Sequence, residues 1–265
     1  GLLLTTVNNQ QVTVLELVPS FLRELLETLE QNEQAIALPT LRWLMVTGEA
    51  FPPDLATRWL SLYPPIPLVN AYGPTECSDD VTHHFISEAS SITASTVPIG
   101  KAIDNTRLYI LDKLLQPVPV GVAGQLYVGG TGVGRGYLNA PSKTADVFIP
   151  DCFSDEPGQR LYNTGDVAVY RQDGTIDFKG REDFQVKVRG HRIELEEIEK
   201  ALLNQKEVSQ AVVTSTTDSF GATQLIAFFT CNQGKETGVE NQSESNEISE
   251  AIRTKLKGVL PSYMI

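Results

Sequence analysis

The sequence predicts an α/β protein: a parallel-sheet subdomain followed by a mostly β subdomain, plus a small C-terminal α+β domain. Up to about residue 97, apolar runs alternate with amphipathic helical stretches, which is typical of a parallel sheet with crossover helices. From residue 98, short β-rich runs are separated by turn residues. Beyond Gly180-Arg181-Glu182-Asp183 helices and strands mix again. We therefore expect one large domain over residues 1–182 and a small mobile one over residues 183–265.

Composition excludes several classes of protein. The chain has 265 residues, 41% of them hydrophobic and 20% charged, as globular proteins do. A net charge of −12 disfavours nucleic acid or an anionic membrane as the main partner. Three widely spaced cysteines form no disulfide framework or zinc spacing, and no apolar run approaches the ~18 residues of a membrane span. We expect a cytoplasmic protein.

The first part predicts strand, helix, strand, helix, strand. Residues 12–18 are β-branched and apolar apart from Glu16, and Pro19-Ser20 then ends this strand and caps a helix over residues 21–30. A strand over 41–46, a helix opening at Pro52-Pro53 and ending at Leu62, and a strand over 66–69 follow. The carboxyl ends of parallel strands meet at one edge of the sheet, where ligands bind.

The segment Asn70 to Glu76 directly follows the third strand. Gly73-Pro74 predicts a turn, so we expect this segment to be irregular. It offers an aromatic face, an amide, a hydroxyl and a carboxylate. An ordinary polar turn is the alternative to a binding loop.

The β-rich part is predicted from strands over 107–111, 125–128, 167–170 and 175–178, with a hairpin turn at Gln172-Asp173-Gly174. The segment Gly124 to Asn139 is rich in glycine. It lacks the lysine and helix opening of a phosphate loop, so tight turns are the favoured interpretation.

The last part predicts a strand over 184–189, a helix over 194–204, and strands over 208–214 and 224–230. A polar loop over 232–246 and a helix over 247–260 complete it.

Four motifs together resemble the adenylate-forming enzymes, and most of all the adenylation domains of nonribosomal peptide synthetases. They are Asn70-Ala71-Tyr72-Gly73-Pro74-Thr75-Glu76, Gly124 to Asn139, Tyr162-Asn163-Thr164-Gly165-Asp166, and Gly180-Arg181 through Arg189-Gly190-His191-Arg192-Ile193-Glu194. They stand in the order and spacing of that family and cover nearly the whole chain.

The resemblance implies a reaction. An amino-acid carboxylate attacks the α-phosphate of ATP to give an aminoacyl adenylate and pyrophosphate. The acyl group then passes to the phosphopantetheine thiol of a carrier domain. ATP and Mg²⁺ are the implied cofactors, and peptidyl carrier and condensation domains are the implied partners.

The same resemblance implies residue roles at the nucleotide. Tyr72 stacks on adenine with Phe178 on the other face, and Asn70 pairs with the adenine amino group. Thr75 binds the α-phosphate and Glu76 holds Mg²⁺. Asp166 binds the ribose hydroxyls and Arg181 the ribose or a phosphate. Three further assignments follow: Ala71 belongs to the nucleotide-binding segment, Asp183 is the hinge, and Lys187 faces the site in the thioester-forming state.

Alternatives remain for three of these residues. Asp166 is also suited to cap a turn after Gly165. The alternative for Arg181 is a surface ion pair, worth less than about 1 kcal/mol. Lys187, the lone lysine in an alternating strand, is also compatible with a solvent-facing charge.

The implied substrate pocket is acidic. Its lining, carried over by position, is Glu16, Met45, Thr47, Ala71, Asp79 and Asp80. Buried carboxylates need partners, and a guanidinium pairs with them bidentately. The hypothesis is therefore a basic amino acid: arginine first, then ornithine or lysine. The alternative is that Glu16 faces solvent and that Asp79 or Asp80 caps a helix.

Some family elements lie outside this sequence. The phosphate loop and the aspartate for the substrate's amino group are expected before Gly1, and the adenylate-binding lysine after Ile265. We therefore expect an incomplete small domain and a fragment that is inactive alone. The rival functions are an acyl- or aryl-CoA ligase and a non-catalytic nucleotide-binding module.

Overall fold

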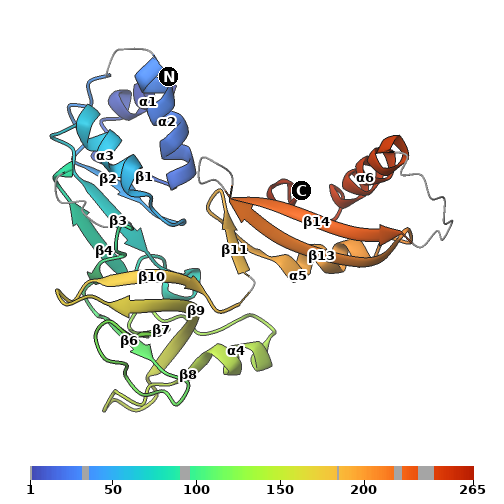
Figure 1. The fold of residues 1–265 in the computed structure, drawn as a ribbon. Helices are drawn as coiled ribbons and strands as arrows, with labels where there is room; N and C mark the ends of the chain where they lie inside the picture. The colour runs from blue at the N-terminus through green and yellow to red at the C-terminus, as the bar shows by residue number, and fades with distance from the viewer. Residues whose placement is uncertain (1, 32–35, 90–95, 184, 218–222, 232–241) are drawn as a thin grey trace. The chain divides into compact units, whose positions relative to one another are not determined.

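The computed structural model describes residues 2–31, 36–89, 96–183, 185–217, 223–231 and 242–265 (Figure 1). The described chain divides into two compact units, Gly1–Asp183 and Phe184–Ile265. The units are described separately below. No helix among the described residues is long and apolar enough to cross a membrane.

A five-stranded mixed sheet forms the first part of the larger unit. Its strands run in the order β1 (Val14–Leu17), β2 (Trp43–Val46), β3 (Leu68–Tyr72), β4 (Thr82–Ile86) and β5 (Lys101–Ala102). The pairs β1–β2 and β2–β3 are parallel, as the alternation of strands and helices predicts, whereas β4 and β5 are antiparallel additions. The parallel sheet expected from sequence is therefore a mixed one.

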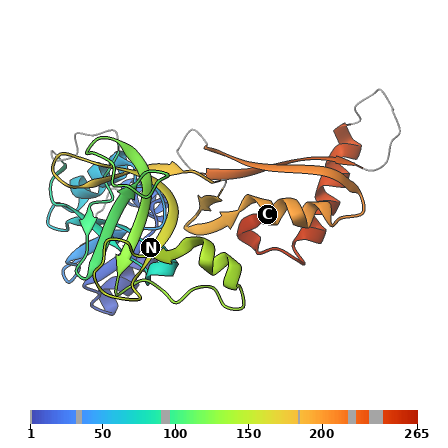
Figure 2. The same ribbon diagram turned by 90° about the horizontal axis from the view of Figure 1, so that it is seen from below.

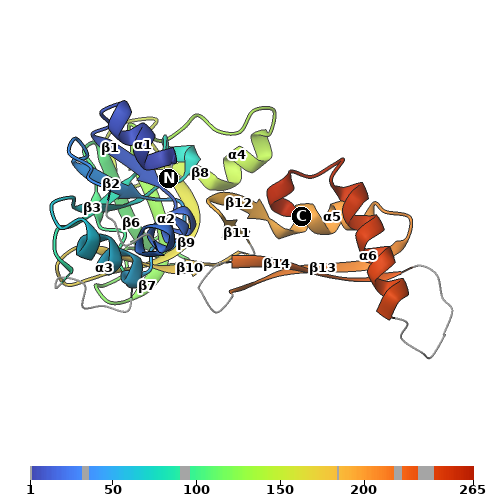
Figure 3. The same cartoon turned by 90° about the horizontal axis from the view of Figure 1, so that it is seen from above.

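Three helices, α1 (Leu2–Asn9), α2 (Pro19–Gln31) and α3 (Pro53–Leu62), lie against this sheet (Figures 1 and 3). Their apolar residues share one core with the strands, which includes Leu4, Leu26, Leu44, Trp59 and Leu68. The helix α1 was not predicted, because only the short run Leu2-Leu3-Leu4 marks it.

The expected cap of α2 is wrong. The helix begins at Pro19, where proline suits the first turn, so Ser20 is a helical residue rather than the cap. The amide and hydroxyl of Ser20 instead donate to the two carboxylate oxygens of Glu49, at 3.0 and 3.2 Å. A side chain that follows β2 thus satisfies the start of α2.

The segment after the third strand is also more regular than expected. Asn70, Ala71 and Tyr72 belong to β3, where β4 pairs with them, and Thr75–Cys77 forms a 3₁₀ helix, η1. Within this segment only Gly73 and Pro74 lie outside regular structure. A strand partner that lies later in the chain extends β3 beyond its apolar run.

The β-rich part is an antiparallel sheet in the order β10-β9-β7-β6, with β8 paired to β9. Its strands are β6 (Thr106–Leu111), β7 (Ala123–Gly130), β8 (Phe148–Pro150), β9 (Arg160–Tyr170) and β10 (Ile176–Arg181), with helix α4 (Pro141–Val147) before β8. The predicted hairpin turn is confirmed, since Gly174 has φ +78° and β9 pairs with β10 across it. Of the segment Gly180-Arg181-Glu182-Asp183, where the sequence predicts the joint between domains, Gly180 and Arg181 end β10, and the larger unit ends at Asp183.

The smaller unit contains two antiparallel pairs, β11 (Gln185–Val188) with β12 (His191–Glu194), and β13 (Val208–Thr217) with β14 (Thr223–Cys231). The helix α5 (Leu195–Leu203) lies along the β13–β14 pair (Figure 2), and Ile198 and Val213 share a core with Ile252 of α6 (Gln242–Leu256). A 3₁₀ turn, η3 (Ser262–Met264), follows near the end of the unit.

Two boundaries differ from expectation here. The predicted strand over 184–189 is observed as β11, but it ends at Val188, because Arg189 and Gly190 turn the chain with φ values of +50° and +78° into β12, a strand that the sequence did not predict. Residues 242–246, expected in the polar loop, begin α6, whereas residues 232–241 of that loop lie outside the described residues.

Candidate nucleotide and amino-acid site

The turn after β3 is folded tightly onto the residues that follow it. A Cβ at Gly73 would lie 1.7 Å from the carbonyl oxygen of Asp79, so only glycine fits. Ser78 and Asp79 both have positive φ, at +65° and +83°. This strained backbone turns the chain from η1 into β4. It also fixes the backbone positions from which the side chains of Thr75, Glu76 and Asp79 extend.

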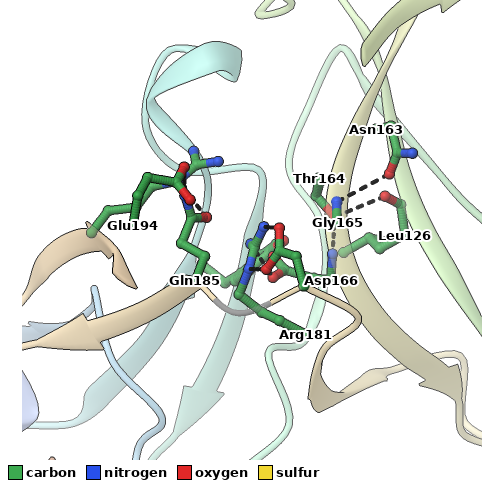
Figure 4. Close-up of polar contacts among 11 residues, drawn as sticks. Leu126, Asn163, Thr164, Gly165, Asp166, Arg181, Gln185 and Glu194 are labelled. Atoms are coloured by element: carbon green, nitrogen blue, oxygen red, sulfur yellow. Dashed lines mark hydrogen bonds and ion pairs between the residues drawn. The ribbon is translucent and has the colours of Figure 1, made fainter. Parts of the chain in front are cut away.

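A buried carboxylate links three strands of the larger unit. Asp166, on β9, is 4% exposed and accepts a hydrogen bond from the Tyr72 hydroxyl at the end of β3. Its other oxygen accepts from Arg181 Nη1, on β10, at 2.6 Å. The backbone of Asp166 is also held in place. The Asp166 amide donates to Thr164 Oγ1, and the Thr164 hydroxyl in turn donates to the Leu126 carbonyl (Figure 4).

Arg181 is shared between two carboxylates. Its Nε and Nη2 form a fork with Asp183, at 2.6 and 2.7 Å, while Nη1 binds Asp166. Gly165 gives the guanidinium room, since a Cβ there would lie 2.6 Å from Nη2. Arg181 therefore does form ion pairs, as its alternative interpretation expects. One of the two partner carboxylates, Asp166, is however buried.

Electrostatics fix the protonation of this group. Burial, and then the charge of Asp166, raise the pKa of Tyr72 well above its ordinary value, so its hydroxyl is the donor. Burial opposes the charge on Arg181, but hydrogen bonds to Asp183 and the charge of Asp166 raise its pKa on balance. The arrangement is an anion held between a phenol and a guanidinium.

The predicted adenine contacts meet two constraints. The Tyr72 and Phe178 rings lie 6.4 Å apart at 37°, which is the spacing of a direct aromatic pair. A base between them requires the rings to separate. Asn70 is 3% exposed, and its Nδ2 donates to the Pro98 carbonyl at 2.7 Å. The roles of Tyr72, Phe178 and Asn70 at adenine stay predictions.

Glu76 has a partner that sequence reasoning missed. The Tyr137 hydroxyl, from the glycine-rich segment, donates to Glu76 Oε1 at 2.6 Å. The amide of Gly134 donates to the Glu76 carbonyl oxygen at 2.7 Å. The favoured interpretation of that segment as tight turns holds for part of it, since residues 124–130 belong to β7 and turns lie at residues 131–132 and 138–139. Nothing local in the sequence indicates the contact, because the two residues are 61 positions apart.

The residues around Glu76 are suited to an Mg²⁺ ion that takes most of its ligands from a bound nucleotide and water. No group of three or more His, Cys, Asp or Glu residues suited to a metal occurs within the described part of the chain. Mg²⁺ commonly binds through one or two carboxylates, with nucleotide phosphates and water as the remaining ligands. Glu76, half-buried beside the exposed Thr75, suits that mode and no closed protein cage.

The six residues of the expected amino-acid pocket lie along one side of the first sheet and the turn beside it. Glu16 is opposite Met45, Met45 is opposite Val69, and Ala71 follows two positions later on β3. Thr47 directly follows β2. Ala71 is buried, Met45 and Thr47 are half-buried, and Glu16 is exposed, as its solvent-facing alternative expects.

The acids nevertheless influence one another. Partial desolvation of its carboxyl group, and then the charges of Asp80 and Asp79, raise the pKa of Glu16 above its ordinary value. Burial raises the pKa of Asp80, against an opposing hydrogen bond from His83 at 3.1 Å. The helix-cap alternative for Asp79 and Asp80 is wrong, because the element that follows them is the strand β4.

Lys187 lies on β11 of the smaller unit, half-buried and opposite Arg192. In the same hairpin, Gln185 is buried and donates to Glu194 (Figure 4). The expected role of Lys187 toward the nucleotide stays a prediction.

The comparisons with known proteins agree on one family. A family model described as "AMP-binding enzyme" matches residues 1–138. Chondramide synthase cmdD from Chondromyces crocatus is 45% identical over 229 residues, which is 86% of this chain and 6% of that protein. Malpinin synthetase from Mortierella alpina is 41% identical over 234 residues, which is 86% of this chain and 3% of that protein. The chain thus spans less than a tenth of the length of these relatives.

Two solved structures are similar over most of the chain. One is NpsA-ThdA, an artificially fused adenylation–PCP di-domain from Klebsiella oxytoca, with a TM-score of 0.80, 25% identity, and coverage of 100% of this chain and 45% of that one. The other is the Vibrio cholerae adenylation domain AlmE in complex with glycyl-adenosine-5'-phosphate, with a TM-score of 0.72, 29% identity, and coverage of 87% and 44%.

Proposed function

The chain belongs to the AMP-binding enzymes, in the group of nonribosomal peptide synthetase adenylation domains, and we propose that it serves ATP-dependent amino-acid activation there. In this reaction a substrate carboxylate oxygen attacks the α-phosphorus of ATP, and pyrophosphate leaves. A carrier thiol then loses its proton and attacks the acyl carbon, and AMP leaves. The carrier domain, with its phosphopantetheine arm, and a condensation domain are the proposed cytoplasmic partners.

The observation that carries the nucleotide role is the buried Asp166 between Tyr72 and Arg181. A carboxylate with two oxygens suits two adjacent ribose hydroxyls, which would take the place of one or both present donors. Arg181, freed or retained, supplies a fixed positive charge for a phosphate or the ribose. Thr75 donates to the α-phosphate, and Asn70, Tyr72 and Phe178 enclose adenine next to Ala71.

Glu76 would hold Mg²⁺ together with the nucleotide phosphates. When bound, the cation neutralises charge on the attacked phosphate. Asp183 is the proposed hinge between the two units, and its fork with Arg181 would join the hinge to the nucleotide site. Lys187 is proposed to face the site in the second, thioester-forming state.

We propose a basic amino acid as the substrate, arginine first, with ornithine and lysine next. The support is electrostatic: the charges of Asp80 and Asp79 help to raise the pKa of Glu16, burial raises the pKa of Asp80, and a cationic side chain would favour the ionised form of both carboxyl groups. A guanidinium would also pair with Asp80, one oxygen of which is buried with no hydrogen-bond partner among the described residues.

The test is pyrophosphate exchange by the adenylation domain that contains this segment, offered arginine, ornithine, lysine, leucine and phenylalanine. Arginine is expected to give the fastest exchange. Asp80→Asn should reduce exchange with arginine, whereas Glu24→Gln, exposed on α2, should not. Fastest exchange with leucine or phenylalanine would rule out the basic substrate. Exchange with an acid that lacks an amino group would instead favour an acyl- or aryl-CoA ligase.

We expect the 265-residue chain alone to turn over poorly, because it spans less than half of the adenylation-domain structures it matches. Calorimetric titration of this chain with ATP and Mg²⁺ separates binding from turnover. Binding without exchange, in the chain and in the complete domain alike, would favour a non-catalytic nucleotide-binding module.

A further inference from the structure

The glycine-rich segment holds the turn that carries Glu76. Gly134 donates its amide to the Glu76 carbonyl at 2.7 Å, and Ser78 Oγ donates to the Gly132 carbonyl at 2.9 Å. A Cβ at Gly132 or Gly134 would lie 2.8 Å from the carbonyl oxygen of Cys77 or Glu76. The two backbones therefore touch directly, and the absence of side chains permits it.

The same segment also reaches the Glu76 side chain. Tyr137 Oη donates to Glu76 Oε1 at 2.6 Å, the length of a hydrogen bond strengthened by charge. Main chain and carboxylate of one residue are thus both held by residues 134–137. The side chain of Glu76 extends from a 3₁₀ helix of only three residues.

Tyr137 is itself fixed by its surroundings. Its amide donates to Thr144 Oγ1 at 2.9 Å, and its ring meets Phe148 edge-on at 5.7 Å. Lys143 Nζ lies 4.9 Å from the ring centroid. Arg160 donates to the carbonyl oxygens of Gly134 and Arg135, at 2.7 and 2.9 Å. These contacts support the observed orientation of the phenol, in which its hydroxyl points at the Glu76 carboxylate.

We propose that Tyr137 is a positioning residue for Glu76, which orients that carboxylate toward a divalent cation bound with the nucleotide phosphates. The inference rests on the proposed function, because it needs Glu76 to meet such a cation. A carboxylate has two oxygens with about four acceptor directions, and the Tyr137 bond uses one of them. Loss of a residue that orients a metal ligand typically weakens metal binding about 10- to 100-fold.

The test uses the 265-residue chain, Mn²⁺ as a spectroscopic probe and a non-hydrolysable ATP analogue. Electron paramagnetic resonance gives the Kd for Mn²⁺ with the analogue present, and calorimetry in EDTA gives the Kd for the analogue alone. Tyr137→Phe is expected to raise the Mn²⁺ Kd by about 10-fold and to leave the Kd in EDTA unchanged. In a Glu76→Gln background it should have no further effect.

Tyr170→Phe is the matched control, since it also removes a phenol hydrogen bond, to the Leu108 carbonyl at 2.8 Å. Tyr170→Phe should lower thermal stability about as much as Tyr137→Phe does, but it should leave the Mn²⁺ Kd unchanged. If Tyr137→Phe fails to fold, Thr144→Val removes the acceptor of the Tyr137 amide and should weaken Mn²⁺ binding to a smaller extent.

The outcomes separate the two proposals. The positioning role alone would be overturned if wild type and Tyr137→Phe bound Mn²⁺ with equal affinity. It would also be overturned if Tyr137→Phe weakened binding of the analogue in EDTA as much as it weakened binding of Mn²⁺. A wild-type chain that binds neither the analogue nor Mn²⁺ would count against the proposed function and, with it, this inference.

Discussion

At the scale of single residues, two buried threonines differ in how their hydroxyls are satisfied. Thr82 is fully buried, and its Oγ1 has no hydrogen-bond partner among the described residues. Thr164 is 2% exposed, but its Oγ1 donates to Leu126 and accepts from Asp166. The same residue type should therefore respond to the same substitution in opposite directions.

Thr82→Val is expected to stabilise the larger unit by about 1 kcal/mol, because a buried unsatisfied hydroxyl is replaced by a methyl group of similar size. Thr164→Val, the matched variant, should lower the free energy of unfolding by about 1–3 kcal/mol, since it leaves two buried backbone groups without their hydrogen-bond partner. Denaturant unfolding measures both. A destabilised Thr82→Val variant would mean that the hydroxyl has a partner in solution.

Asp80 should make stability depend on pH. Its folded-state pKa is raised above the ordinary value of 3.8, chiefly by burial, so the folded chain binds more protons than the unfolded chain between those two values. Stability contributed at this site therefore falls as the pH rises through that window.

Asp80→Asn should accordingly raise the melting temperature above that of wild type at about pH 7, and the gain should vanish near pH 3, where both forms are neutral. Differential scanning fluorimetry measures it. Asp104→Asn, at an exposed turn, is the control for general charge removal. A gain of the same size at both pH values would show that charge at Asp80 is not its source.

At the scale of elements, the start of α2 depends on a residue from another element. Both oxygens of Glu49 accept from Ser20, at 3.0 and 3.2 Å, so a carboxylate lies where the helix dipole is positive.

Glu49→Ala should destabilise the larger unit by about 1–2 kcal/mol, as losses of helix caps do. Glu24→Ala, exposed within the same helix, should change stability by less than about 0.5 kcal/mol. Chemical denaturation monitored by Trp fluorescence compares them. Equal effects would mean that Ser20 needs no carboxylate partner.

The elements also define what sequence could predict. The succession of β1, α2, β2, α3 and β3 follows from apolar periodicity and proline positions, which are local signals. Strand β4 was missed because Thr82-His83-His84-Phe85-Ile86 has no clear alternation, and its pairing with β3 stabilises it. For the same reason β3 continues through Tyr72.

The candidate site was predictable to a similar extent. The motif resemblance named Tyr72, Asp166 and Arg181, which the structure brings into contact from three strands. The Tyr137–Glu76 contact could not be predicted from local pattern, because it joins positions 61 residues apart and depends on how η1 meets a loop.

At the scale of the whole molecule, the chain has separate cores in its two units. Leu44 is fully buried in the first, and Leu202 is 2% exposed in the second. The compact units meet in sequence between Asp183 and Phe184.

We therefore expect two unfolding transitions by scanning calorimetry. Leu44→Ala should lower one of them and Leu202→Ala the other, each by about 2–5 kcal/mol of unfolding free energy. A single transition that both substitutions lower equally would mean that the units unfold as one.

The alternation of side chains along β3 has one more consequence. Asn70 and Tyr72 project from one surface of the sheet, and Val69 and Ala71 from the other, where Met45 is the neighbour in register. Substitutions at the odd-numbered positions of this strand therefore change only the surface that carries Val69 and Ala71. The surface that carries Asn70 and Tyr72 is left as it is. A single inserted residue would exchange the two sets at once, so natural variation here should proceed by replacement and not by changes in length.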